Sequence, residues 1–304
     1  AVASQGPGPL KRYTYTEYHM GVDTRLVVYA PDKSVAESAC ADAFERIATL
    51  DSIMSDYRKN SELTHLSDQA GGQPIGISAE LMRVFQVSQE FSRHSDGMFD
   101  VTIGPVVQLW RKARKTKILP TLGEIDAARR LVDYRGLILD TQARTAYLKR
   151  PGMRLDLGAI GKGYADDEAL AVLKHHGIKS ALIEMGGDVV VSDPPPGMKG
   201  WKVEVPNAGN RTMTLSNCAI SSSGDTEQFV EIGGKHFSHV VNPKTGWALT
   251  QRVQVTVIAP TGLIADPLST SFTLVAPTSR DALLKQFKGV KAFVKRIDNG
   301  QPKG

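Results

Sequence analysis

The sequence predicts an α+β fold in which mixed sheets carry flanking helices. Helical and strand patterns follow one another without regular alternation along the 304 residues, which argues against a repeating βαβ architecture. No internal repeat or long low-complexity segment occurs, and 41% hydrophobic with 23% charged residues is an ordinary globular composition. A chain of this length can bury a large core, as one domain or as two closely packed lobes.

The expected elements follow from apolar spacing and from turn residues. Strands are expected within 12–30 with a break at 21–24, on both sides of a turn at 140–143, at 154–157, 181–184 and 189–191, and over most of 201–260. Helices are expected over 34–56, 78–95, 124–131, 161–176, 263–275 and 280–288. Residues 1–10, rich in Gly and Pro, are expected to form a flexible tether, and residues 11–304 the folded unit.

Charge and hydropathy restrict the class of function. The net charge is +5, and no run of 18 apolar residues occurs, so no transmembrane segment is expected. No nucleic-acid-binding motif occurs, and nucleic acid is not an expected partner. The opening Ala1–Pro9 lacks the features of a signal peptide, so none is expected in this chain. One basic cluster is either a solvated helix end or a surface that attracts an anion: Arg111, Lys112, Arg114, Lys115 and Lys117.

The two cysteines indicate little about redox chemistry. Cys40 lies on the apolar stripe of the helix expected over 34–56, where a buried thiol is the expected state. A disulfide between Cys40 and Cys218 stays open, because sequence does not show whether the geometry is compatible.

Glycines at 158, 161 and 163 lie between an expected strand and an expected helix. The backbone amides of such a turn can approach a phosphate, and the helix N-terminus adds partial positive charge. The alternative is a tight strand-to-helix turn without a ligand. The glycine order differs from the dinucleotide fingerprint, and Gly163 stands where a P-loop needs Ser or Thr after Lys162.

Three later segments carry further polar groups. Ser221–Ser223 can hydrogen-bond a ligand or form a polar turn, and a serine nucleophile with Asp225 and His239 lacks its usual motif. His236 and His239 fall on opposite faces of a strand, which disfavours one shared metal, and His239 is a candidate general base or a structural histidine. Asp266 and Thr270 share a helix face near its expected start, with Pro267 in the first turn. This pair suits Mg²⁺ or, alternatively, is a helix cap with an exposed threonine.

These segments together resemble one family. They are, in order, Met20-Gly with Thr24, Met54-Ser-Asp-Tyr57 with Ser61-Glu-Leu63, Asp96-Gly-Met-Phe-Asp-Val-Thr102 with Gly104-Pro105, Asp156–Ala165, Glu184-Met-Gly-Gly-Asp188, Ser221-Ser-Ser-Gly-Asp225, His239-Val-Val-Asn-Pro-Lys-Thr-Gly246 and Ala265-Asp-Pro-Leu-Ser-Thr270. Over about residues 18–276 the chain resembles the ApbE family of FAD:protein FMN transferases.

The resemblance implies a single two-lobed, tunnelling-fold-like α+β unit around an FAD cleft. It implies transfer of the FMN half of FAD to a Thr or Ser of an acceptor protein that carries a flavinylation motif, a respiratory redox-complex subunit being typical, with release of AMP. Mg²⁺, with Mn²⁺ as an alternative, would be held by the main-chain oxygen of Ala159 together with Asp266 and Thr270. His239 would be the base. The residues that would contact FAD are Met20, Tyr57, Met98, Phe99, Asp100, Asp156, Lys162, Ser222, Ser223 and Val240.

The resemblance also implies an exported, periplasmic or otherwise extracytoplasmic protein, often membrane-anchored through a lipid. Two residues depart from the family pattern, Asn242 where Asp is common and Pro267 where a small residue is common. Two other functions compete with transfer. One is an FAD pyrophosphatase that gives FMN and AMP, and the other is a non-catalytic flavin-binding protein, which has no need of a metal pair at Asp266 and Thr270.

Overall fold

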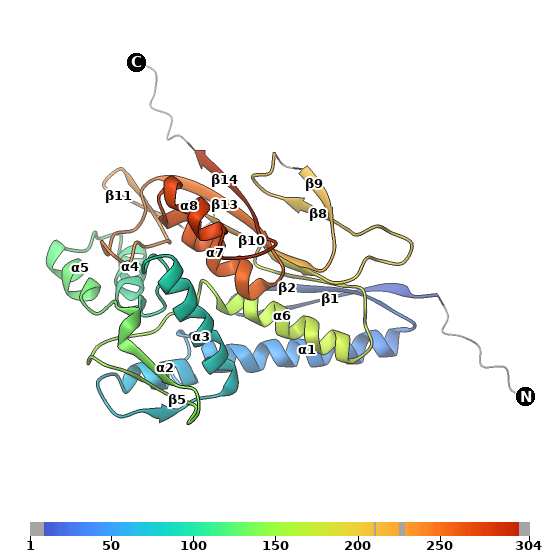
Figure 1. The fold of residues 1–304 in the computed structure, drawn as a ribbon, viewed down its shortest axis with the longest axis horizontal. Helices are drawn as coiled ribbons and strands as arrows, with labels where there is room; N and C mark the ends of the chain where they lie inside the picture. The colour runs from blue at the N-terminus through green and yellow to red at the C-terminus, as the bar shows by residue number, and fades with distance from the viewer. Residues whose placement is uncertain (1–8, 210, 225–228, 298–304) are drawn as a thin grey trace, which may run out of the picture.

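The largest element of the fold is a seven-stranded antiparallel sheet with strand order β1-β2-β6-β7-β10-β13-β14 (Figure 1). The computed structural model describes residues 9–209, 211–224 and 229–297. The strands of this sheet are β1 (Lys11–His19), β2 (Val22–Ala30), β6 (Ala181–Met185), β7 (Asp188–Val191), β10 (Cys218–Gly224), β13 (Arg252–Ala259) and β14 (Lys291–Ile297).

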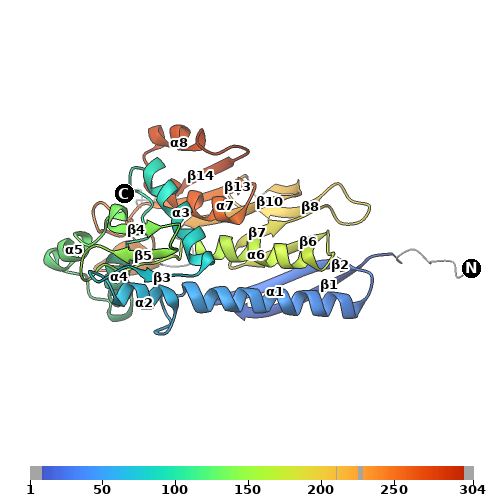
Figure 2. The same cartoon turned by 60° about the horizontal axis from the view of Figure 1, so that its bottom comes forward.

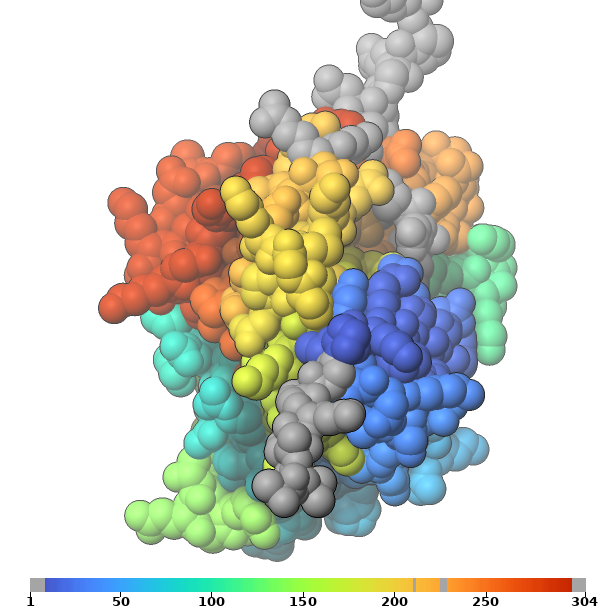
Figure 3. All heavy atoms as spheres, turned by 90° about the vertical axis from the view of Figure 1, so that its right-hand side faces the viewer, coloured from blue at the N-terminus to red at the C-terminus, as the bar shows by residue number. Residues whose placement is uncertain are grey.

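Helices cover one face of this sheet, and a hairpin covers the other. Because side chains alternate along a strand, Leu26 and Val28 enter the large core under the helices, whereas Val27 joins a second core on the opposite face. The helices are α1 (Lys33–Met54), α6 (Gly161–His175) and α7 (Gly262–Leu274) (Figure 2). The hairpin is β8 (Trp201–Val205) with β9 (Arg211–Leu215), and Figure 3 shows it in yellow between the N-terminal strands in blue and the C-terminal segments in red.

Most of the remaining elements extend the molecule at the end of the sheet opposite the N-terminus, whereas α8 lies beside β14 (Figure 2). The remaining elements are α2 (Glu62–Asp68), β3 (Ile75–Gly76), α3 (Ala79–His94), α4 (Gly104–Thr116), α5 (Leu122–Arg129), η1 (Tyr134–Gly136), β4 (Leu137–Asp140), β5 (Thr145–Leu148), β11 (Phe229–Ile232), β12 (Lys235–Ser238) and α8 (Pro277–Leu284). A smaller core surrounds the fully buried Trp110 of α4, whose Nε1 donates to the carbonyl of Gly246 at 2.8 Å. This bond ties α4 to the turn that follows β12.

The mixed α+β fold is confirmed, with corrections to individual elements. No strand forms over 154–157, where the structure has only an isolated bridge between Ile103 and Arg154. The Leu155 amide instead donates to Ser67 Oγ at 3.1 Å, so a side chain takes the place of a strand partner. Helix α5 begins two residues earlier than expected, because Thr121 and Glu124 form a capping box. Helices α2 and α4 and strand β14 were not expected, and α8 ends four residues before the expected boundary.

The termini and cysteines complete the comparison with sequence. Of the tether expected over 1–10, residues 1–8 lie outside the described part of the chain. Within that described part, no helix combines the length and apolarity needed to cross a membrane. Cys40 is buried in the large core as expected, and it and Cys218 are free thiols.

Candidate active site

Helices α6 and α7 cross in direct backbone contact at a pair of glycines. A Cβ added at Gly163 would lie 2.2 Å from the carbonyl oxygen of Gly262, so only glycine permits this approach. Each helix also caps the other. Asp266 of α7 accepts from the Gly163 amide at 3.1 Å, and Asp167 of α6 accepts from the amides of Gly262 and Leu263, both at 2.8 Å. The glycine-rich turn and the Asp266 segment, far apart in sequence, are therefore held together.

The structure corrects the expected surroundings of Asp266. This residue lies in the second turn of α7 and is only 3% exposed, and Pro267 lies inside the helix rather than in its first turn. Burial raises the pKa of Asp266 to about 7, although the positive charge of Lys162 lowers it. Asp266 is therefore a buried carboxylate that caps a neighbouring helix, not an exposed one at the start of its own helix.

Lys162 is the cation at the centre of three buried carboxylates. Its ammonium group pairs with Asp188 at the start of β7, and its pKa is raised because the charges of Asp188 and Asp266 outweigh burial. Asp166, one turn along α6, is fully buried, and neither of its oxygens has a hydrogen-bond partner among the described residues. Burial and the charge of Asp188 raise the pKa of Asp166 well above its usual value. The cluster thus holds more potential negative than positive charge.

A row of hydroxyl groups continues from α7 to β10. Ser223 Oγ lies 3.0 Å from Thr270 Oγ1 and 2.7 Å from Ser269 Oγ. Ser221 Oγ lies 3.1 Å from the same Ser269 hydroxyl. Ser222 points to the other side of the strand, where its hydroxyl lies 2.9 Å from Thr256 Oγ1, as alternation requires. Of the two serines expected to contact FAD, Ser223 therefore shares the Thr270 side of the sheet and Ser222 does not.

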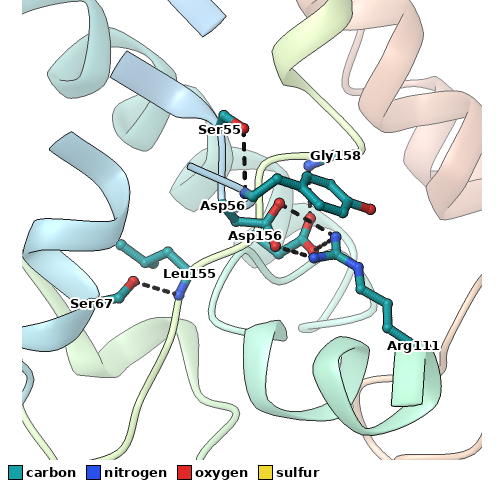
Figure 4. Close-up of polar contacts among 8 residues, drawn as sticks. Ser55, Asp56, Ser67, Arg111, Leu155, Asp156 and Gly158 are labelled. Carbon is teal, nitrogen blue, oxygen red and sulfur yellow. Dashed lines mark hydrogen bonds and ion pairs between the residues drawn. The ribbon is translucent and has the colours of Figure 1, made fainter. Parts of the chain in front are cut away.

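The turn before α6 contacts α4 through Asp156 (Figure 4). Asp156 accepts from Arg111 at 2.9 Å and from the Gly158 amide at 2.8 Å. Arg111 also pairs with Asp56, and its guanidinium lies 4.1 Å from the centre of the Tyr57 ring. The basic cluster is thus not only a solvated helix end, because Arg111 is engaged in the site.

Three of the expected FAD contacts follow α3, and they differ in availability. Met98 is half-buried, whereas Phe99 is buried with its ring 5.8 Å from that of Phe91. Both oxygens of Asp100 are engaged, since they accept from the Thr102 amide and hydroxyl and from the Tyr134 amide at 2.7–2.8 Å. Burial raises the pKa of Asp100 to about 6 against these hydrogen bonds. In this structure Phe99, through core packing, and Asp100, through its hydrogen bonds, stabilise the backbone next to Met98.

The remaining expected residues lie in turns. Met20 adopts a left-handed backbone, φ 49°, in the turn between β1 and β2. His239 follows β12, and the amide of the buried Val240 donates to Ser238 Oγ at 3.1 Å. Asn242 Oδ1 accepts from the amides of Lys244 at 2.9 Å and Thr245 at 3.2 Å. An Asp at this position offers the same acceptor, so the departure at Asn242 preserves the turn. Asp225 lies outside the described residues.

The arrangement fits a hard divalent cation that also has ligands from a substrate. Among the described residues, no group of three or more His, Cys, Asp or Glu side chains is arranged to hold a metal alone. Asp266 and Thr270 offer one carboxylate and one hydroxyl, to which the family resemblance adds the main-chain oxygen of Ala159 as an expected ligand. Mg²⁺ characteristically completes such a set with water and phosphate oxygens. The buried negative charge around Lys162 favours an added cation.

Sequence reasoning gave no role to Asp166, Asp167 or Asp188, and it considered Arg111 only as one member of the basic cluster. Asp188 lies in a quoted segment, but its pairing with Lys162 joins residues 26 positions apart. The Arg111 contacts span 45 and 55 positions. The one signal available in the sequence was the positive charge of the basic cluster that contains Arg111. Charge alone does not show which carboxylates an arginine pairs with.

Comparisons with known proteins identify the family of the chain. FAD:protein FMN transferase of Klebsiella pneumoniae strain 342 is 28% identical over 283 residues, covering 92% of this chain and 88% of the relative. The Escherichia coli K12 protein of that name is 29% identical over 251 residues, covering 78% and 70%. In fold, the chain is similar to the Pseudomonas stutzeri flavinyl transferase ApbE, apo form, with TM-score 0.83, 24% identity and coverage of 95% and 96%. The ApbE family model matches residues 20–294, nearly the whole chain, and the chain therefore belongs to the ApbE family.

Proposed function

We propose that the chain transfers the FMN part of FAD to a Thr or Ser hydroxyl of an acceptor protein, with Mg²⁺, and releases AMP. Family membership supports the reaction class. The structural observation that carries the proposal is the α6–α7 crossing, which joins the glycine-rich turn to Asp266 and Thr270. That junction places a hydroxyl row beside buried carboxylates, which could hold a cation that neutralises the charge of a pyrophosphate.

In the proposed reaction, the acceptor oxygen forms a bond to the phosphorus atom of the FMN half. The bond from that phosphorus to the bridging oxygen breaks, and AMP leaves with the electron pair. His239 takes the proton of the acceptor hydroxyl. Lys162 holds the pyrophosphate by its positive charge, beside the N-terminus of α6. Mg²⁺ would be held by the main-chain oxygen of Ala159 with Asp266 and Thr270, and when bound it would neutralise phosphate charge.

The decisive experiment is incubation of the protein with FAD, Mg²⁺ and an acceptor that carries the flavinylation motif, followed by mass spectrometry of the acceptor. The expected result is a mass increase equal to FMN esterified to the motif Thr or Ser. Release of free FMN and AMP with an unmodified acceptor would instead establish an FAD pyrophosphatase. Bound but intact FAD would establish a flavin-binding protein. A Thr→Val change in the motif is the control, because it removes the nucleophile.

The cellular setting is part of the proposal. On the basis of the family resemblance, we propose that the protein is extracytoplasmic and membrane-associated and that its acceptor is a subunit of a respiratory redox complex. Fractionation of the native organism, with detection of the protein and of flavin covalently bound to its acceptor, tests both. Recovery of the protein with cytoplasmic enzymes would contradict the location.

A further inference from the structure

Arg111 connects three segments of the chain at the candidate site. It projects from α4 and pairs with Asp56, which follows α1, and with Asp156, which precedes the glycine-rich turn (Figure 4). Its side chain is 23% exposed, so these pairs are partly shielded from water. A partly buried arginine that forms hydrogen bonds with two carboxylates fixes the positions of both.

The same guanidinium supports an exposed aromatic ring. Tyr57 is 76% exposed, yet one face of its ring rests on Arg111 at 4.1 Å. Ser55 Oγ accepts from the Tyr57 amide at 3.3 Å, which restrains the backbone at the ring. An exposed tyrosine ordinarily samples several rotamers, and a planar cation behind it favours one. The arrangement presents the outer ring face as a platform for a flat ligand.

Arg111 also controls the charge around Asp156. Burial and the charge of Asp56 raise the pKa of Asp156, and Arg111 opposes this. Arg114, one turn further along α4, is a half-buried cation with no hydrogen-bond or ion-pair partner among the described residues. Without Arg111, the two carboxylates would repel each other and the Tyr57 ring would lose its support. The effect on the site would therefore exceed the loss of one ion pair.

We propose that Arg111 is a positioning residue for FAD, which holds Tyr57 as a stacking platform and Asp156 beside the glycine-rich turn. The inference rests on the proposed function, in which Tyr57 and Asp156 contact FAD. Arg111 does not need to touch the reacting atoms. Its removal is expected to weaken FAD binding rather than to abolish the chemical step.

The chain offers a matched control in Arg46. This α1 residue also bridges two carboxylates, Glu80 and Glu168, and its side chain is 24% exposed, against 23% for Arg111. Neither Glu80 nor Glu168 is among the residues expected to contact FAD or metal. If both arginines only stabilised the fold, replacing either one would lower Tm by a similar amount and leave FAD affinity unchanged. We expect replacement of Arg111 alone to weaken FAD binding.

The test compares Arg111→Met, Arg111→Lys, Arg46→Met and wild type by thermal unfolding, FAD titration through flavin fluorescence, and transfer kinetics. Arg111→Met is expected to weaken FAD binding at least tenfold with kcat changed less than threefold, and Arg46→Met to change the FAD Kd less than twofold at a similar loss of Tm. Arg111→Lys, which restores charge without the planar group, should be intermediate. If Arg111→Met does not fold, Arg111→Lys against Arg46→Lys decides in the same way.

Equal FAD affinity in wild type and the Arg111 variants, or an equal loss in the Arg46 variants, would overturn the inference. A wild type that binds FAD but modifies no acceptor contradicts the proposed function, while the affinity comparison still decides the role of Arg111.

Discussion

Lys162 and Arg111 each gather carboxylates around one cation, but the two clusters balance their charge differently. Around Arg111, Asp56 and Asp156 are both directly bonded, and Arg114, which has no ion-pair partner within the described part of the chain, adds a second positive charge nearby. Around Lys162, only Asp188 is directly paired, Asp266 receives one backbone amide, and Asp166 has no described partner. The charges of the Arg111 cluster are therefore balanced within the cluster. The Lys162 cluster has more carboxylates than cations, and an additional cation would neutralise the excess negative charge.

The largest effect expected from this difference follows removal of Asp266. Asp266→Ala should lower Mg²⁺-dependent turnover about 10³-fold, because it deletes the charged ligand of the metal. It should also destabilise the fold by about 1 kcal/mol, because Asp266 caps α6. Transfer kinetics with Mg²⁺ measure the first effect and urea unfolding the second, and calorimetric titration with Mn²⁺ in the presence of FAD measures metal affinity. Glu80→Ala, which breaks an ion pair with Arg46 away from the expected FAD and metal contacts, is the control and should retain Mn²⁺ affinity. Equal Mn²⁺ affinity in wild type and Asp266→Ala would refute the metal assignment.

Removal of His239, the candidate base, should lower the transfer rate without changing the affinity for FAD or Mn²⁺. His239→Ala is expected to slow transfer at least ~10²-fold while FAD and Mn²⁺ affinities stay near wild type. Single-turnover transfer with saturating FAD measures the step. Near wild-type turnover at neutral pH would show that His239 is structural.

The backbone contact that brings the Lys162 cluster to α7 should tolerate no side chain. Gly163→Ala places a Cβ against the Gly262 carbonyl, and it is expected to cost about 3 kcal/mol of unfolding free energy. Gly123→Ala in α5 is the matched control, because a Cβ there meets nothing within 4 Å, and it should be neutral or slightly stabilising. Urea midpoints for the two variants measure the difference. A Gly163→Ala protein as stable as Gly123→Ala would show that the helices separate readily.

Neutralising Asp166 should stabilise the protein, increasingly so as the pH rises. Its pKa is raised in the folded state, so the stability that this raised pKa contributes is fully present below the unfolded pKa of about 4 and is lost as the pH rises through the folded pKa. Asp166→Asn should therefore gain about 1–2 kcal/mol over wild type at pH 8 and less at pH 5. Unfolding curves at both pH values measure the trend. A gain that shrinks with rising pH would mean that Asp166 is ionised and satisfied in the fold.

The smallest expected effect follows substitution of Tyr57, the aromatic platform that Arg111 supports. Tyr57→Ala should weaken FAD binding about five- to tenfold, the equivalent of one aromatic stacking contact, and Tyr57→Phe should leave it unchanged. Fluorescence titration distinguishes them. An equal loss in both variants would assign the contribution to the hydroxyl rather than to the ring.

Patterns within short stretches of sequence predicted most helices and strands. The site was harder to predict, because it depends on contacts between residues that are far apart in the sequence. Apolar spacing gave α1, α3 and α6 because each buries one face, and the i, i+4 spacing of Asp266 and Thr270 gave their shared helix face. Helix α4 escaped detection because its Gly104-Pro105 start resembles a turn. Burial of Asp266 was not predictable, because it depends on Gly163 and Gly262 meeting. Family resemblance supplied the candidate residues, and the tertiary structure supplied Asp166, Asp188 and Arg111.

The exchange of caps between α6 and α7 has a consequence for biosynthesis. A chain made from its N-terminus exposes Gly163 about a hundred residues before Gly262 is synthesised, and domains fold as their segments emerge. Until then the α6 amide lacks its acceptor and the carboxylate of Asp266 does not yet exist. An incomplete chain therefore cannot assemble the proposed cation site, which can form only after residue 270 has left the ribosome.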